Sequence, residues 1–551
     1  MKNFKNRSLF IYGFFLTCLI SIAYWKIFSI FYQQDEWLTF GRGLVVDSVY
    51  DLFAGRNIFQ ILLGEGRFIP FVIGNSFFKY FPLNAMPFAL LSLLFHLVNS
   101  LLVFGLAKRF LKNDLLAFLG ALFFGINSVS SSAVSWFGTS LGTLPSLTFV
   151  LAAVYTFFKH LDGQKRHWPL VSFLFLYFSL FFKEIGIHLF LILPLLGLLF
   201  RKEKLKKFVG AYWYFFAFFL LNLVVRLLQM RSLEADQAAL FLTNTSYYFW
   251  QIILVRAILY SLTSFSLVFI PASSFVEFGR MVTRIYYPFI PSEHFLLLSQ
   301  TAVLDMLSLL LTLLVFLVAA FLTRKSSKIE KSSVLFWVGF TLTSVIPYVV
   351  ISKNYAYLES RYYYLTAASA GLIFAYLAKK VFYLAKSFKF RVVTVFVVIF
   401  FLHWHSKELL KDLQLQRDVS QERISFLTQL AGYVPTLEGD KNVFFITSDA
   451  DYYQIGNKVP FQQGTGYTLM VRYFRSGKIP REFLDEPHNV FQPFLYALAS
   501  QGYNDLNGKG FGYYWDENLL KEDIKQKKFS YDDVLSLYYD SKAKTLIKKQ
   551  L

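Results

Sequence analysis

The chain has 551 residues, of which 56% are hydrophobic and 16% are charged, and its mean hydropathy is +0.46. A soluble protein of this length needs more charge to cover its surface, so the composition excludes an ordinary soluble enzyme and indicates a membrane protein. The net charge of +20 comes from Lys and Arg in short clusters between apolar runs. Orientation in a membrane explains such clusters better than nucleic acid binding does, so no nucleic acid partner is expected.

The first predicted element is an apolar run from Leu9 to about Phe31, which follows Lys2, Lys5 and Arg7. This run is too long for the core of a secretion signal, so it predicts a retained membrane helix. It contains the single cysteine, Cys18, which can form neither an internal disulfide nor a Cys-rich metal site.

Apolar runs of spanning length then recur along the chain and predict an all-α polytopic membrane bundle with about 11 transmembrane helices. After the first, they begin near Asn84, Leu115, Leu144, Trp168, Ile185, Phe208, Phe295, Val334, Tyr362 and Val392. The interrupted run 249–270 is left open: it could lie along the interface, re-enter the membrane or make two short passes.

Five basic clusters between these runs predict the sidedness of the bundle. They occupy residues 108–112, 159–166, 201–207, 324–331 and 379–391. By the positive-inside rule they lie in the cytoplasm with the N-terminus. Because an even number of crossings must separate two such clusters, the polar loops at 33–37, 135–143, 183–184 and 353–361 all face the outer side.

The sequence changes character after about His403, which predicts two domains, 1–404 in the membrane and 405–551 outside it. The second part begins with a charged helical stretch, and a β-like run at Asn442 to Thr447 follows. A small extracytoplasmic mixed α/β C-terminal domain is therefore expected.

The first candidate site is the adjacent pair Asp35 and Glu36, directly after the first helix. A low-dielectric wall and a like charge raise a carboxyl pKa, and such a group can act as a general base toward a hydroxyl or hold a divalent cation. The alternative is a solvated pair that marks the end of a helix.

Two further candidates lie on later outer loops. Lys183 and Glu184 form a hairpin tip, and spacing puts Glu184 and His188 on one helical face. Arg361 and Tyr362 belong to the run Glu-Ser-Arg-Tyr-Tyr-Tyr, in which Arg suits bidentate phosphate contact and Tyr hydroxyls add donors. A simple polar turn and an ordinary aromatic belt are the alternatives.

Taken in this order, the three motifs resemble the GT-C superfamily of polytopic glycosyltransferases, nearest to the protein O-mannosyltransferase type and its bacterial relatives. The resemblance covers roughly residues 1–404 and implies a polyprenyl-phosphate sugar donor bound from the membrane. It implies transfer, with inversion, to a glycan, lipid or protein acceptor on the outer face. Asp35 resembles the base that activates the acceptor, with Glu36 as its companion, and Arg361 resembles a phosphate contact. Lys183 and Glu184 match a recurrent motif without an assigned role.

The sequence departs from that family in two respects. The second extramembrane acidic motif of many members has no clear counterpart, and 405–551 lacks their tetratricopeptide or sugar-binding patterns. Three alternatives therefore remain: an O-antigen-type polymerase or ligase, a lipid or solute transporter, and a non-catalytic scaffold. A transporter would place ionisable residues midway through its helices, whereas here they stand mostly at helix ends.

Overall fold

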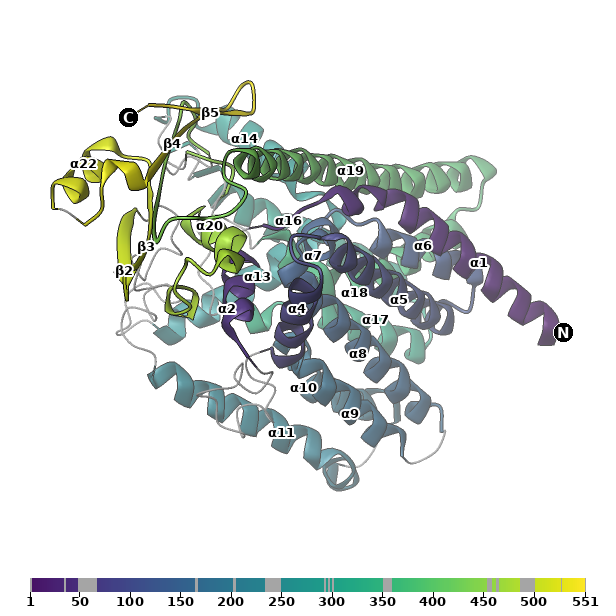
Figure 1. The fold of residues 1–551 in the computed structure, drawn as a ribbon. Helices are drawn as coiled ribbons and strands as arrows, with labels where there is room; N and C mark the ends of the chain where they lie inside the picture. Colours follow the sequence, from purple (N-terminus) through teal and green to yellow (C-terminus); the bar gives the residue numbers. More distant parts are fainter. Residues whose placement is uncertain are drawn as a thin grey trace.

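The fold is a bundle of helices with a five-stranded sheet near the C-terminus (Figure 1). It is known from a computed structural model. The residues that it describes are 2–33, 36–47, 67–163, 167–201, 205–232, 249–291, 294–295, 298–299, 302–349, 359–452, 458–461, 465–485, 501–526 and 528–550.

Seven helical segments in the described part are long and apolar enough to cross a membrane, as a bundle of membrane helices requires. They contain α1 (Lys2–Ala23), α5 (Met86–Leu111), α8 (Phe137–Leu161), α16 (Ala302–Thr323), α17 (Lys328–Thr343), α18 (Tyr364–Leu384) and α19 (Phe388–Tyr433). The other four predicted runs form helices whose apolar parts are shorter: α6 (Asp114–Gly125), α9 (Trp168–Leu180), α10 (Leu189–Arg201) and α11 (Leu205–Ser232). A multi-pass helical membrane protein is therefore confirmed, whereas the count of eleven crossings stays a prediction.

The run left open in the sequence forms α13 (Phe249–Phe269), and α14 (Ala272–Tyr286) follows it. The two helices are bent by 108° at a break that contains Pro271, which lacks the N–H needed to continue a helix. Thr312 of α16 donates a hydrogen bond to the carbonyl of Leu262, and this contact ties α13 into the bundle. The pair has the form of a broken span or a re-entrant loop.

Close packing inside the bundle depends on small residues and on buried polar groups. A Cβ at Gly120 of α6 would lie 2.7 Å from the carbonyl oxygen of Gly371 in α18, so only glycine allows these two backbones to touch. The buried His96 of α5 joins the same two helices, because it bonds both to the carbonyl of Gly125 and to the hydroxyl of Tyr364, each at 2.8 Å. His96 is thus an interhelical hydrogen-bonding residue.

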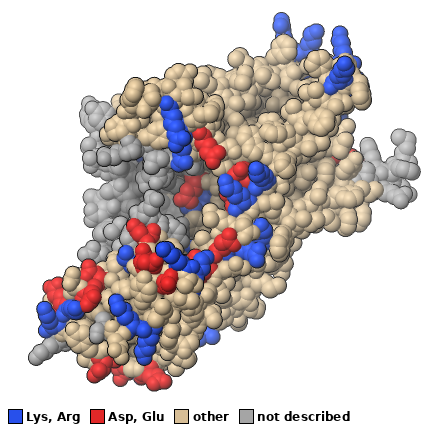
Figure 2. All heavy atoms as spheres, turned by 90° about the horizontal axis from the view of Figure 1, so that it is seen from above, with Lys and Arg blue, Asp and Glu red and all other residues tan. Residues whose placement is uncertain are grey.

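Two ends of the bundle can be distinguished. At the basic end, which we define by Arg109, Lys112, Glu330 and Lys379, the ends of α5, α8 and α18 meet the start of α17. At the sheet end lie the loop after α1 and the short elements α2 (Glu36–Val45), α4 (Phe68–Tyr80), α7 (Ser130–Ser135) and the 3₁₀ turns Glu184–Gly186, Ile346–Tyr348 and Ser360–Tyr363. On the face in Figure 2, charged side chains gather in groups, and a broad surface between them carries none.

The C-terminal sheet contains both parallel and antiparallel pairs in the order β2-β3-β1-β4-β5. The central strand, β1, contains the predicted run Asn442 to Thr447, so the expected sheet is confirmed. The strands are β1 (Lys441–Ser448), β2 (Gly502–Leu506), β3 (Lys509–Tyr514), β4 (Val534–Asp540) and β5 (Thr545–Lys548), accompanied by α20 (Thr465–Tyr473), α21 (Glu482–Asp485) and α22 (Glu517–Lys525).

Helix α19 joins this sheet to the bundle without interruption, so the predicted domain boundary between residues 404 and 405 falls inside one helix. The buried Arg423 of α19 donates hydrogen bonds to the carbonyls of Tyr32 and Pro460, at 3.2 and 2.7 Å. Trp37 of α2 packs against Phe461. These contacts hold the C-terminal part against the loop that follows α1.

Candidate functional site

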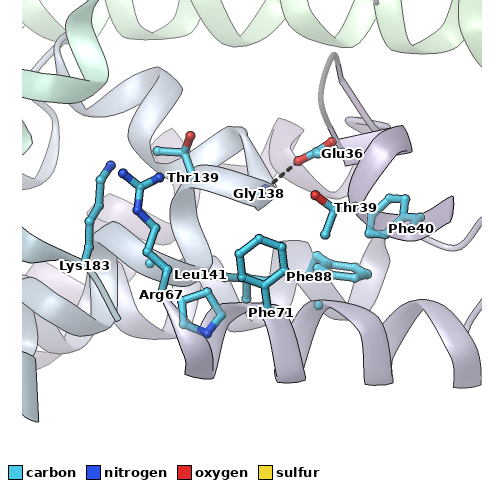
Figure 3. Close-up of a pocket in the computed structure, with 13 residues that line it drawn as sticks. Glu36, Thr39, Phe40, Arg67, Phe71, Phe88, Gly138, Thr139, Leu141 and Lys183 are labelled. Carbon is cyan, nitrogen blue, oxygen red and sulfur yellow. Dashed lines mark hydrogen bonds between the residues drawn. The ribbon is translucent and has the colours of Figure 1, made fainter. Parts of the chain in front are cut away.

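The first cavity lies at the sheet end between α2, α4 and α8 and has a volume of about 150 Å³ (Figure 3). In this view Glu36 and Thr39 stand at one end, Arg67 and Lys183 at the other, and apolar side chains such as Phe71 lie between them. A carboxylate and two cations therefore line the same cavity. Its lining comprises Glu36, Thr39, Phe40, Arg67, Pro70, Phe71, Gly74, Phe88, Gly138, Thr139, Leu141, Gly142 and Lys183.

Glu36 is buried and accepts two backbone hydrogen bonds, one on each carboxylate oxygen. Gly138 N–H donates to Oε1 at 2.6 Å, and Gln33 N–H donates to Oε2 at 2.5 Å. Gly138 belongs to the first turn of α8, whose N-cap residue, Trp136, makes no side-chain cap. Because first-turn N–H groups lack partners within their own helix and favour negative charge, Glu36 caps α8 from a different helix.

Arg67 forms a two-pronged ion pair with Glu184, 117 residues further along the chain. Nη2 lies 2.9 Å from Oε1 and Nε lies 3.4 Å from Oε2, the fork geometry that suits a carboxylate. The negative charge of Glu184 raises the pKa of Arg67 above its ordinary value. Arg67 also has a left-handed backbone, φ 50°, at the start of α4, which is uncommon outside glycine.

Lys183 is buried, and its ammonium donates a hydrogen bond to the hydroxyl of Thr143 at 2.9 Å. The same ammonium lies over the rings of Tyr348 and Tyr362, 5.9 and 5.7 Å from their centroids. A buried ammonium needs such compensation because it has left water.

A second cavity, of about 430 Å³, lies on the other side of the loop after α1. Arg361 lines it, pairs with Glu359 and stacks on Trp136, with the guanidinium carbon 3.9 Å from the ring centroid. The full lining is Gln33, Ser128, Val129, Ser132, Trp136, Ala272, Ser273, Glu359, Ser360, Arg361, Glu408 and Asp412.

The two cavities are neighbours. Gln33 lines the second cavity, while its N–H bonds to Glu36 of the first. Tyr362 lies beneath both cations, with Lys183 at 5.7 Å and Arg361 at 5.0 Å from its ring centroid. The structure thus brings Glu36, Lys183, Glu184, Arg361 and Tyr362 into one region, although Arg361 faces a different cavity from Glu36 and Lys183.

Of the two remaining predicted site residues, the structure describes only His188. Asp35 lies outside the described residues. His188 is buried against Phe340, with ring centroids 5.7 Å apart, and does not line either cavity. Within the described ranges, no group of three or more His, Cys, Asp or Glu side chains could hold a metal ion.

Sequence reasoning missed Arg67, Thr143 and the acidic pair Glu408 and Asp412. Glu408 and Asp412 look like ordinary charges of a solvated helix, and only the placement of α19 against α7 brings them to the second cavity. Arg67 stands directly before an apolar run, where a lone cation usually marks a helix end. No protein-family model matches the chain, and a search of curated protein sequences finds no relative.

Proposed function

We propose that the chain is a membrane glycosyltransferase that moves a sugar from a polyprenyl-phosphate donor to a hydroxyl acceptor. The observation that carries the proposal is the first cavity, which sets two cations, Arg67 and Lys183, at the opposite end from the carboxylate of Glu36. Cations stabilise a departing phosphate, and a carboxylate accepts the proton of an attacking hydroxyl. The three motifs of the family resemblance support the same reaction.

In the proposed reaction the acceptor oxygen attacks the anomeric carbon while the bond from that carbon to the phosphate oxygen breaks. The proton of the hydroxyl passes to Asp35, and the electron pair leaves with the lipid phosphate. Arg67 and Lys183 receive the phosphate charge, for which Arg67 must share its fork between Glu184 and the ligand. In-line displacement of this kind inverts the anomeric centre.

Glu36 has a positioning role in this proposal. Both of its oxygens already accept backbone N–H groups, one from Gln33 and one from Gly138. Its two hydrogen bonds tie Gln33 and the start of α2 to the first turn of α8. Asp35, its neighbour in sequence, therefore remains the assigned base.

The sidedness belongs to the proposal as well. We place the N-terminus and the basic end in the cytoplasm and the sheet end outside a plasma or inner membrane, with the four shorter helices also crossing. Three basic segments, around Arg109, Lys331 and Lys379, meet at one end of the bundle, as the positive-inside rule requires. The lipid tail of the donor can then remain in the bilayer while its phosphate enters the first cavity.

The test is release of polyprenyl phosphate from polyprenyl-phosphate sugars by the purified protein in nanodiscs, with Lys183→Met and Arg67→Gln as variants. Each variant should lower turnover by about a hundredfold, as loss of one charge-stabilising donor typically does. Arg481→Gln is the matched control, because Arg481 pairs with Asp47 and its side chain is 47% exposed against 50% for Arg67. Wild-type turnover in both cavity variants, or movement of intact donor across the bilayer without cleavage, would refute the proposal.

A further inference from the structure

The basic end of the bundle contains a cavity that the proposed reaction does not use. It lies between α5, α8, α17 and α18 and has a volume of about 540 Å³, and its wall combines apolar and aromatic side chains with charged ones. Its lining consists of Leu106, Arg109, Phe110, Lys112, Phe158, Asp162, Phe200, Ser327, Ile329, Glu330, Ser333, Trp337 and Lys379.

Positive charge is in excess around this cavity. Arg109 pairs with Asp162, and Lys380, next to the lining, pairs with Glu330 at 2.9 Å. Within the described part of the chain, Lys112 and Lys379 are then left without an acidic partner of their own. Among the described residues Lys112 forms no ion pair, and Lys379 lies 3.9 Å from the already paired Glu330 while donating to the carbonyl of Leu111.

Besides these cations, the cavity offers two kinds of N–H group that can donate hydrogen bonds to an anion. Ser327, Ile329 and Glu330 belong to the N-terminal end of α17, where helix N–H groups and the helix dipole favour an anion. The indole N–H of the buried Trp337 has no hydrogen-bond partner among the described residues, although Trp337 lines the cavity. A buried donor without a partner is rare and indicates a missing acceptor.

We infer that this cavity binds an anionic phospholipid, with the phosphodiester near Lys112, Lys379 and the start of α17 and an acyl chain along the aromatic wall. The apolar wall favours a lipid over a soluble phosphate: Phe110, Phe158 and Phe200 offer nothing to a small hydrophilic anion, but they can pack against a hydrocarbon chain. Basic pockets between membrane helices bind anionic head groups in this manner.

The experiment is native mass spectrometry of the full chain, released from vesicles of phosphatidylcholine with one-tenth phosphatidylglycerol. The wild type should retain phosphatidylglycerol in preference to phosphatidylcholine. Lys112→Gln combined with Lys379→Gln should lower the apparent affinity at least about tenfold, since each cation near a membrane surface contributes a few-fold. Lys386→Gln combined with Lys389→Gln is the matched control, because both lysines are exposed, belong to the neighbouring loop and start of α19, and do not line the cavity.

Trp337→Phe tests the same site without altering its charge. It keeps the ring, removes only the indole N–H and should weaken retention several-fold while leaving the fold intact. Three results would overturn the inference: equal retention of the two lipids by the wild type, equal loss in both lysine pairs, or displacement of the lipid by millimolar inorganic phosphate. Donor cleavage at the sheet end is measured separately, so neither result decides the other.

Discussion

Glu36 holds two backbone N–H groups with one carboxylate, and this explains why the two residues of the Asp35-Glu36 pair should respond differently to substitution. Glutamine offers one carbonyl oxygen and one amide, so Glu36→Gln leaves one buried N–H facing another donor. We expect a loss of about 1–3 kcal/mol of stability, measured as a lower midpoint of thermal unfolding in detergent. Glu438→Gln, at an exposed position, is the control and should leave the midpoint unchanged. Equal midpoints for the two variants would contradict the capping role.

Asp35→Asn should show the opposite pattern. The amide keeps the size of the side chain but cannot take a proton, so turnover should fall about a hundred- to ten-thousandfold. We expect stability to change by no more than about half a kcal/mol, because the substitution keeps the shape of the side chain. Turnover on an authentic polyprenyl-phosphate sugar and the unfolding midpoint are measured on the same preparation. Full activity in this variant would remove Asp35 from the mechanism.

Site residues could be predicted from the sequence wherever a charged motif interrupts an apolar run. Glu36 and Lys183 were both singled out on that ground, and both line the first cavity. Arg67 could not be found in this way, because its significance arises from Glu184, 117 residues away. Arg361 was also singled out from the sequence. Its stacking on Trp136 turns it to the second cavity, and this contact depends on tertiary packing.

At the scale of elements, the contact between α6 and α18 gives a sharp test of helix packing. A methyl group at residue 120 must push the carbonyl of Gly371 away, so Gly120→Ala should destabilise the protein by about 1–3 kcal/mol, as overpacking does. Gly339→Ala in α17 is the control, because its new Cβ would meet nothing within 4 Å and alanine favours helices. Thermal unfolding in detergent compares the two. A midpoint for Gly120→Ala at or above that of Gly339→Ala would show that the helices separate at no cost.

Helices and strands were predictable from the sequence where the pattern that defines them lies within one short stretch of the chain. The length of the apolar runs located the helices, and the short run at β1 located a strand of the sheet. The sheet order was not accessible, because β1 pairs with β3 and β4, which lie far along the chain. The change to polar sequence after His403 suggested a boundary, but helical propensity continues across it, so α19 runs on.

At the scale of the whole molecule, the proposed sidedness can be tested with single cysteines because the chain has only Cys18. In a Cys18→Ser background, Ser541→Cys lies at the sheet end and Lys386→Cys lies beyond the basic end of α18. A membrane-impermeant maleimide should label residue 541 in intact cells and residue 386 only after permeabilisation. Labelling in the reverse pattern would invert the proposed topology and place both sheet-end cavities in the cytoplasm.

Helix α19 also has a mechanical consequence. Its 46 residues rise about 1.5 Å each, giving a rod of about 69 Å, whereas the hydrocarbon of a bilayer is about 30 Å thick. Hydrogen bonds hold this helix to the rest of the protein along its length. They join His405 to Ser128, Arg423 to the carbonyl of Tyr32, and Tyr433 to the carbonyl of Leu546 in β5. Because a continuous helix does not shorten, in the proposed topology α19 sets the distance between the sheet and the hydrocarbon. A change in bilayer thickness must then be accommodated by a tilt of α19 together with the sheet.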